Sequence, residues 1–147
     1  MGPIGNLLEE TKITKLNDAI AAGTSAINSG IVDMSGYDGV VFLISTGTVL
    51  ATGTATIKAQ QGAASNMADA TDLIGTSQAF IDTDDNKSVA IDIKRPNERY
   101  VRCVITRAVA NSDWGPIWAL QYRARKVPVT QGLDKYESHT NPIEGTA

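Results

Sequence analysis

The sequence predicts an all-β protein, an antiparallel β-sandwich or jelly-roll-like barrel of about seven to eight strands with extended termini. The first observation is the run of residues 86–93, in which Val89, Ile91 and Ile93 are apolar at every second position. That period places one face of a strand in a core and the other in water. The second observation is that similar short runs recur, separated by Gly, Asp, Asn or Ser. The third is size, because 147 residues suffice for one domain with a hydrophobic core.

The N-terminal part is the least determined. Residues 11–22 fit either a helix or an edge strand followed by a turn, so residues 1–23 are assigned to a partly ordered arm. Residues 24–33 predict a strand with a bulge at Gly30. Residues 40–45 are apolar at almost every position, which predicts a central strand covered on both faces.

The next segment, residues 46–53, is rich in Gly and Thr and predicts a loop. Short pieces at 73–76 and 79–81 are expected to cross between sheets. Residues 82–86 offer oxygens at alternate positions, like a calcium loop, but lack its turn glycine and closing glutamate, so an acidic hairpin turn is expected. Further strands are predicted over residues 54–61, 87–93, 99–107 and 117–126.

The alternation ends at Val127, which gives a sandwich domain over residues 24–126 and an extended C-terminal arm over residues 127–147. Pro and Gly interrupt this arm, yet it carries several apolar residues. We expect it to become ordered against a neighbouring subunit or a larger assembly; the alternative is that it folds back along its own domain.

The catalytic inventory is small. Cys103 is in phase with Val101 and Ile105, which predicts a buried core thiol, and His139 lies in a polar tail. A nucleophilic site needs a base held by rigid packing, so no enzyme, catalytic residue, cofactor or metal is expected. Trp118 is in phase with Leu120 and predicts a core residue, whereas Trp114 in the preceding loop is expected to make an exposed contact.

Charge is unevenly distributed along the chain. Residues 1–92 carry 4 basic and 11 acidic residues, whereas residues 93–126 carry 8 basic and 2 acidic ones. This distribution is either chance on solvated faces or a basic band that meets acidic neighbours in an assembly. The net charge of −3 disfavours nucleic acid as a partner, and no apolar run is long enough for a membrane span. The N-terminus has no secretory pattern, so synthesis in a reducing cytoplasm is expected.

Five segments of the chain recur in similar form in one protein family: residues 33–38, 72–75, 97–106, 118–131 and 139–147. Residues 97–106 are similar to a strand of small structural proteins of tailed-bacteriophage virions, and residues 118–131 resemble the last strand of that family and the start of its tail. The resemblance implies a capsid decoration (cement) protein on the virion surface, with the major capsid protein as its partner.

We expect self-association as a homotrimer at threefold positions of the shell. The alternatives are a head–tail connector or tail ring component, and a carbohydrate-binding virion module that uses Trp114. The expected partner-binding residues are Trp114, Arg123, Arg125, Lys126, Val129, Leu133, Tyr136 and Ile143.

Overall fold

The computed structural model describes residues 5–146, and its regular secondary structure is almost entirely antiparallel strand. The elements are α1 (Leu7–Glu10), β1 (Lys12–Asn17), β2 (Ile20–Gly23), β3 (Ile27–Asn28), β4 (Val32–Asp33), β5 (Gly39–Val49), β6 (Thr54–Gly62), β7 (Thr71–Asp72), β8 (Gln78–Ile81), β9 (Ser88–Lys94), β10 (Tyr100–Ala108), β11 (Ser112–Trp114) and β12 (Ile117–Tyr122).

The strands pair as one long hairpin rolled on itself. In three places two consecutive short strands lie along the same neighbour and act as halves of one interrupted strand: β3 and β4 along β10, β7 and β8 along β6, and β11 and β12 along β5. Strands β1 and β2 form a fourth interrupted strand, because they pair with β12 and β11 in turn. Counted this way, residues 5–146 form eight strands, of which the first pairs with the last, the second with the seventh, the third with the sixth and the fourth with the fifth. This is the jelly-roll arrangement, so the predicted fold class is confirmed.

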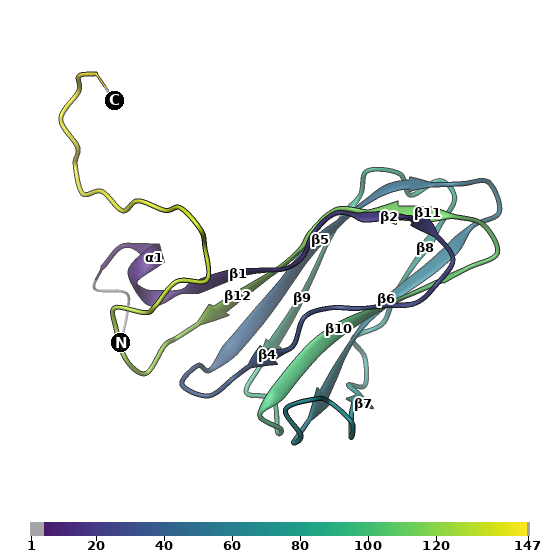
Figure 1. Ribbon diagram of the computed structural model, residues 1–147, viewed down its shortest axis with the longest axis horizontal. Coiled ribbons are helices and arrows are strands. Elements are labelled where there is room, and N and C mark those ends of the chain that lie inside the picture. Colours follow the sequence, from purple (N-terminus) through teal and green to yellow (C-terminus); the bar gives the residue numbers. More distant parts are fainter. Residues whose placement is uncertain (1–4, 147) are drawn as a thin grey trace.

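The eight strands form two layers (Figure 1). One sheet has β1/β2 at one edge, then β12/β11, β5 and β9. The other has β3/β4 at one edge, then β10, β6 and β7/β8. Alternate residues of β5, β6, β9 and β10 point between the sheets and form the core, as the alternation predicts. The fully buried members are Val40, Phe42, Ile57, Ala59, Val101, Cys103 and Ile105, together with Ile117 of β12.

Strand β5 differs from its prediction in two ways. It is central, because β12 and β9 pair with its two edges, but only one face is covered, and Leu43 remains 39% exposed. It also continues to Val49 through the segment predicted as a loop. The extension is held because the Thr46 hydroxyl donates to the Asp84 carbonyl and accepts from the Lys87 N–H.

The N-terminal arm is also corrected. Residues 12–23 form the edge strands β1 and β2, so the sandwich begins at Lys12 rather than at residue 24. Residues 1–4 of the predicted arm lie outside the described residues. The strand predicted over residues 24–33 is divided into β3 and β4, with the expected irregularity at Gly30, where an added Cβ would lie 3.1 Å from the Leu16 carbonyl oxygen.

The two tryptophans exchange their predicted roles. Trp114 lies on β11, within a segment predicted as a loop, and is only 2% exposed, so the exposed contact predicted for it is wrong. Trp118 is half-buried on the outer face of β12, whose core-facing residues are Ile117, Ala119 and Gln121. The register is irregular within β11, and Gly115 and Pro116 interrupt the ladder, so the phase of β12 does not continue that of the preceding residues.

The last predicted strand ends early. Tyr122 closes β12, and Arg123 has a φ of 52° that a continuing strand does not allow. Beyond it no strand is assigned up to residue 146, and Figure 1 shows this segment leaving the sandwich beside α1.

Candidate functional site

Three loops meet at one end of the sandwich. They are residues 34–38 before β5, residues 95–99 between β9 and β10, and residues 123–126 after β12. Backbone hydrogen bonds join them: the Arg95 N–H donates to the Asp38 carbonyl (2.6 Å), and the Arg125 N–H donates to the Gly36 carbonyl (2.9 Å). Because the loops are tied to one another, their side chains form a defined surface.

These loops enclose a cleft of about 470 Å³, which we call the basic cleft. Its lining residues are Met34, Ser35, Tyr37, Asp38, Arg95, Pro96, Asn97, Glu98, Arg99 and Arg125. The three loops together carry five basic and two acidic side chains. Guanidinium groups in such excess suit carboxylate or phosphate groups of a partner.

Two acidic residues anchor part of this charge. Arg99 donates to both oxygens of Asp33 at 2.9 Å, and these bonds lower the pKa of Asp33 below its usual value. The Asp38 carboxylate lies between Arg123 (3.5 Å) and Arg125 (3.6 Å), so two guanidinium groups share one carboxylate. Both arginines therefore keep donors for a partner.

Arg95 is different, because its side chain makes no ion pair with any residue between 5 and 146. Arg95 and Arg123 both have a φ of 52°, a left-handed conformation that costs roughly 1–2 kcal/mol in a residue with a Cβ. Strained residues of this kind are concentrated at functional sites. The basic cleft is therefore the candidate binding site.

The segment after β12 has two parts. Its first part, which we call the strap (residues 129–132), lies along the outer edge of β1. The Val129 N–H donates to the Glu9 carbonyl, and the Gln131 side chain accepts from the Ile13 N–H (2.9 Å) and donates to the Leu8 carbonyl (2.7 Å). This part of the predicted arm folds back along its own domain, which was the alternative expectation.

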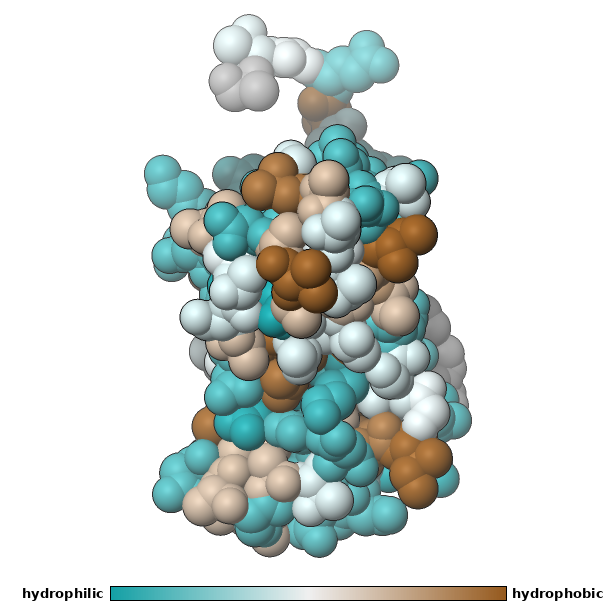
Figure 2. Space-filling view, turned by 90° about the vertical axis from the view of Figure 1, so that its right-hand side faces the viewer, coloured by the Kyte–Doolittle hydropathy of each residue, from teal (hydrophilic) through white to brown (hydrophobic). Residues whose placement is uncertain are grey.

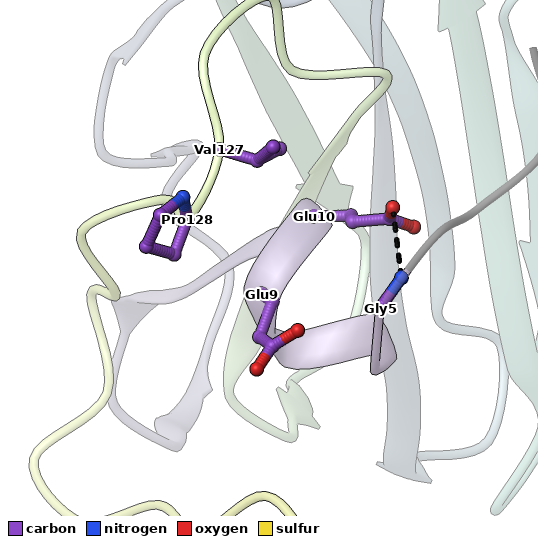
Figure 3. A pocket seen from close by; sticks show the side chains of 5 residues that line it. All are labelled: Gly5, Glu9, Glu10, Val127 and Pro128. Atoms are coloured by element: carbon purple, nitrogen blue, oxygen red, sulfur yellow. Dashed lines mark hydrogen bonds between the residues drawn. The ribbon is translucent and has the colours of Figure 1, made fainter.

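A small recess of about 230 Å³ lies where this segment passes α1 (Figure 3). Val127 and Pro128 line one side, and Gly5, Glu9 and Glu10 line the other. The Gly5 N–H donates to the Glu10 carboxylate at 3.3 Å. The recess therefore belongs to the junction between α1 and the strap.

The second part is bound by the side chain of Asn6. The Asn6 side-chain amide donates to the Ser138 hydroxyl (2.6 Å) and to the His139 carbonyl (3.1 Å). Beyond it lies what we call the distal segment (residues 140–146), which is exposed throughout and directed away from the sandwich in Figure 1. Ile143 is 97% exposed and Tyr136 is 53% exposed.

The predicted partner-binding residues thus separate into three groups. Arg123 and Arg125 are brought to the basic cleft, and Lys126 is exposed next to them. Val129 and Leu133 are half-buried beside their own domain, whereas Tyr136 and Ile143 are exposed. Sequence reasoning did not single out Arg95 and Arg99; the excess of basic residues over 93–126 was the signal for them.

The single cysteine is inert in this fold. Cys103 has no exposed surface, and its burial raises the pKa of the thiol to about 11. A thiol that keeps its proton is a poor nucleophile. His139 is exposed and lies 2.9 Å from Glu137, in the C-terminal segment.

The carboxylates of the acidic turn (residues 82–86) accept hydrogen bonds from backbone N–H groups. Asp82 accepts the Thr52 N–H, and Asp84 and Asp85 accept N–H groups of Ile81 and Val49. Within residues 5–146 no group of three or more His, Cys, Asp or Glu side chains is arranged to hold a metal ion. Over the same range the structure contains no helix with the length and apolar composition needed to span a membrane.

No protein-family model matches the chain, and no curated protein matches its sequence. Among solved structures, the fold is similar to the crystal structure of the PBSX exported protein XepA, with a TM-score of 0.54 and 15% sequence identity. The alignment covers 98% of this chain and 45% of that protein, so the chain spans less than half of the length of the protein it matches. At this identity the similarity establishes a shared fold.

Proposed function

We propose that the chain is a structural protein of a tailed-bacteriophage virion and that it decorates the outer surface of the capsid as a cement protein. The observation that carries the phage assignment is the structural similarity, over almost the whole chain, to a phage-associated exported protein. The sequence resemblance of residues 97–106 and 118–131 to small virion proteins supports the same assignment. The decoration role is the more specific part of the proposal and rests on that resemblance.

The fold suits a protein that acts by binding. Two packed sheets make a rigid module, and the loops at one end present arginines that the fold holds in place. The major capsid protein is the proposed partner, and acidic groups on its surface are the proposed contacts of the basic cleft. Many copies on a symmetric shell convert weak individual contacts into stable attachment.

Catalysis has no part in this proposal. The thiol of Cys103 is enclosed by the core, and the arginines of the basic cleft are binding groups rather than general bases. Burial of Trp114 also removes the residue on which the carbohydrate-binding alternative depended.

The copy number in purified virions tests the proposal. Quantitative mass spectrometry against the major capsid protein should give hundreds of copies for a decoration protein and about a dozen or fewer for a connector or tail ring. A map of the virion by electron microscopy should then show this sandwich on the outer face of the shell. Absence of the protein from virions, with recovery in the medium instead, would overturn the virion assignment.

A further inference from the structure

We infer that the basic cleft binds the distal segment of a second copy of this chain, with Ile143 on the cleft floor and Glu144 against Arg95 and Arg125. The inference deepens the proposed function, on which it rests, because it names a contact through which neighbouring copies associate. The experiment below uses the isolated protein, so its failure is distinguishable from a failure of the copy-number test.

The basic cleft contains guanidinium groups whose hydrogen-bond donors are not all used within the molecule. Arg95 has no ion pair among residues 5–146, and Arg125 lies 3.6 Å from Asp38 Oδ1 and makes no side-chain hydrogen bond within the same range. Arg95 is nevertheless fixed at its backbone, because its N–H is bound to the Asp38 carbonyl. A carboxylate from a partner would therefore meet an unpaired guanidinium group that a hydrogen-bonded backbone presents at the cleft.

The cleft also offers apolar surface beside these charges. Met34 is 6% exposed, and Tyr37 and Pro96 are half-buried. A volume of about 470 Å³ lies within the range of sites that hold small ligands or short peptide segments. The site thus fits a segment with an apolar residue next to an acidic one.

The distal segment has this composition. Ile143 and Glu144 are adjacent, both are exposed, and neither makes a hydrogen bond or an ion pair within the described residues. Pro142 precedes them and restricts the backbone, which reduces the entropy that binding must remove. From residue 127 onward the chain carries three acidic residues and one lysine, so its charge is opposite to that of the cleft.

Geometry favours a second copy over the same molecule. The chain is held at Ser138 and His139 by Asn6, and from there Figure 1 shows the distal segment directed away from the sandwich. The five residues from His139 to Glu144 span at most about 18 Å when fully extended. A segment that projects outward by this length is placed to reach a neighbour.

Charge reversal tests the contact in solution. Sedimentation velocity of the full chain between about 1 µM and 1 mM should show association that weakens as salt is raised. Arg95→Glu and Glu144→Arg should each weaken this association at least about tenfold. Lys87→Glu, which makes the same charge change as Arg95→Glu in the turn at the other end of the sandwich, should leave it unchanged. The side chains of Arg95 and Glu144 are exposed and make no ion pair within residues 5–146, so the thermal midpoints of both variants should match that of the parent.

An equimolar mixture of Arg95→Glu and Glu144→Arg is the decisive measurement. In the mixture each distal segment meets a cleft of opposite charge only on the other variant, so association should return to the parental level. Three results would overturn the inference: a parent that stays monomeric throughout, association that neither substitution changes, and single losses that mixing does not restore. The third result would indicate docking within one molecule.

Discussion

The aromatic rings of Phe80 and Trp114 meet edge to face, with centroids 5.2 Å apart and an interplanar angle of 89°. Phe80 belongs to β8 and Trp114 to β11, so the contact joins the two sheets of the sandwich. The Trp114 indole N–H donates to the Ser112 hydroxyl at 3.2 Å, which satisfies its polar atom inside the core.

Trp114→Ala should therefore lower the free energy of unfolding by about 3–5 kcal/mol, because it removes a buried aromatic ring and leaves a cavity. Urea denaturation followed by circular dichroism measures the loss. Trp118→Ala is the matched control, since it removes the half-buried indole from the outer face and should cost clearly less. Equal losses in the two variants would contradict the assignment of Trp114 to the core.

Arg107 should be a second stabilising residue. It is 8% exposed, and its guanidinium donates to the backbone carbonyls of Ser25, Ala21 and Ser112 at 2.6–2.9 Å. Arg107→Met keeps the apolar stem but leaves three carbonyls without this donor, and should cost about 2 kcal/mol or more. Arg102→Met, which removes a single bond to the Gln60 side chain, should cost less in the same denaturation experiment.

The raised pKa of the Cys103 thiol predicts that the free energy of unfolding depends on pH in the alkaline range. Its ordinary pKa is near 9, and burial raises it to about 11 in the folded protein. Between these values the unfolded chain binds fewer protons than the folded one, so this residue's contribution makes stability fall as pH rises from about 9 to about 11. The free energy of unfolding of the parent should therefore fall relative to that of Cys103→Ala as the pH rises over that range. Thiol reagents should label Cys103 only after denaturation, and rapid native labelling would disprove its burial.

The acidic turn should not need a metal ion. Asp82, Asp84 and Asp85 each hold a backbone N–H, which is a structural task. We expect EDTA to leave the thermal midpoint unchanged. A fall of several degrees that calcium reverses would show that this turn is a binding site.

The strap should protect the edge of β1. Gln131 contacts the backbone at Leu8, Thr11 and Ile13, so Gln131→Ala should speed amide hydrogen exchange around residue 13 while the core strands remain protected. Truncation after residue 139 retains the strap and should leave this exchange as in the parent. If truncation after residue 126 left it unchanged too, the strap would have no stabilising role.

The alternation of apolar residues was sufficient to predict much of the fold. Residues 54–61, 87–93 and 99–107 correspond to β6, β9 and β10, and Cys103 is buried as its phase predicted. Such predictions succeed where both flanking turns are marked and one face is apolar, because the strand period of two is then unambiguous. The fold class followed from the number and spacing of these runs.

Where the pattern was short or interrupted, tertiary contacts decided the structure. Residues 12–17 form a strand because they pair with β12, not because their composition excludes a helix. Trp114 and Trp118 lie on opposite faces because of a local irregularity that no periodicity reveals.

The sequence by itself determined the sandwich, the buried thiol, the acidic turn and the excess of basic residues over 93–126. Only the tertiary structure decided which of those basic residues meet. Arg125 meets Arg95 and Arg99 because the loops at one end of a rolled hairpin converge, although β10, β11 and β12 separate it from them in sequence. Such convergence depends on strand order, which is set by packing over the whole core rather than by any local pattern.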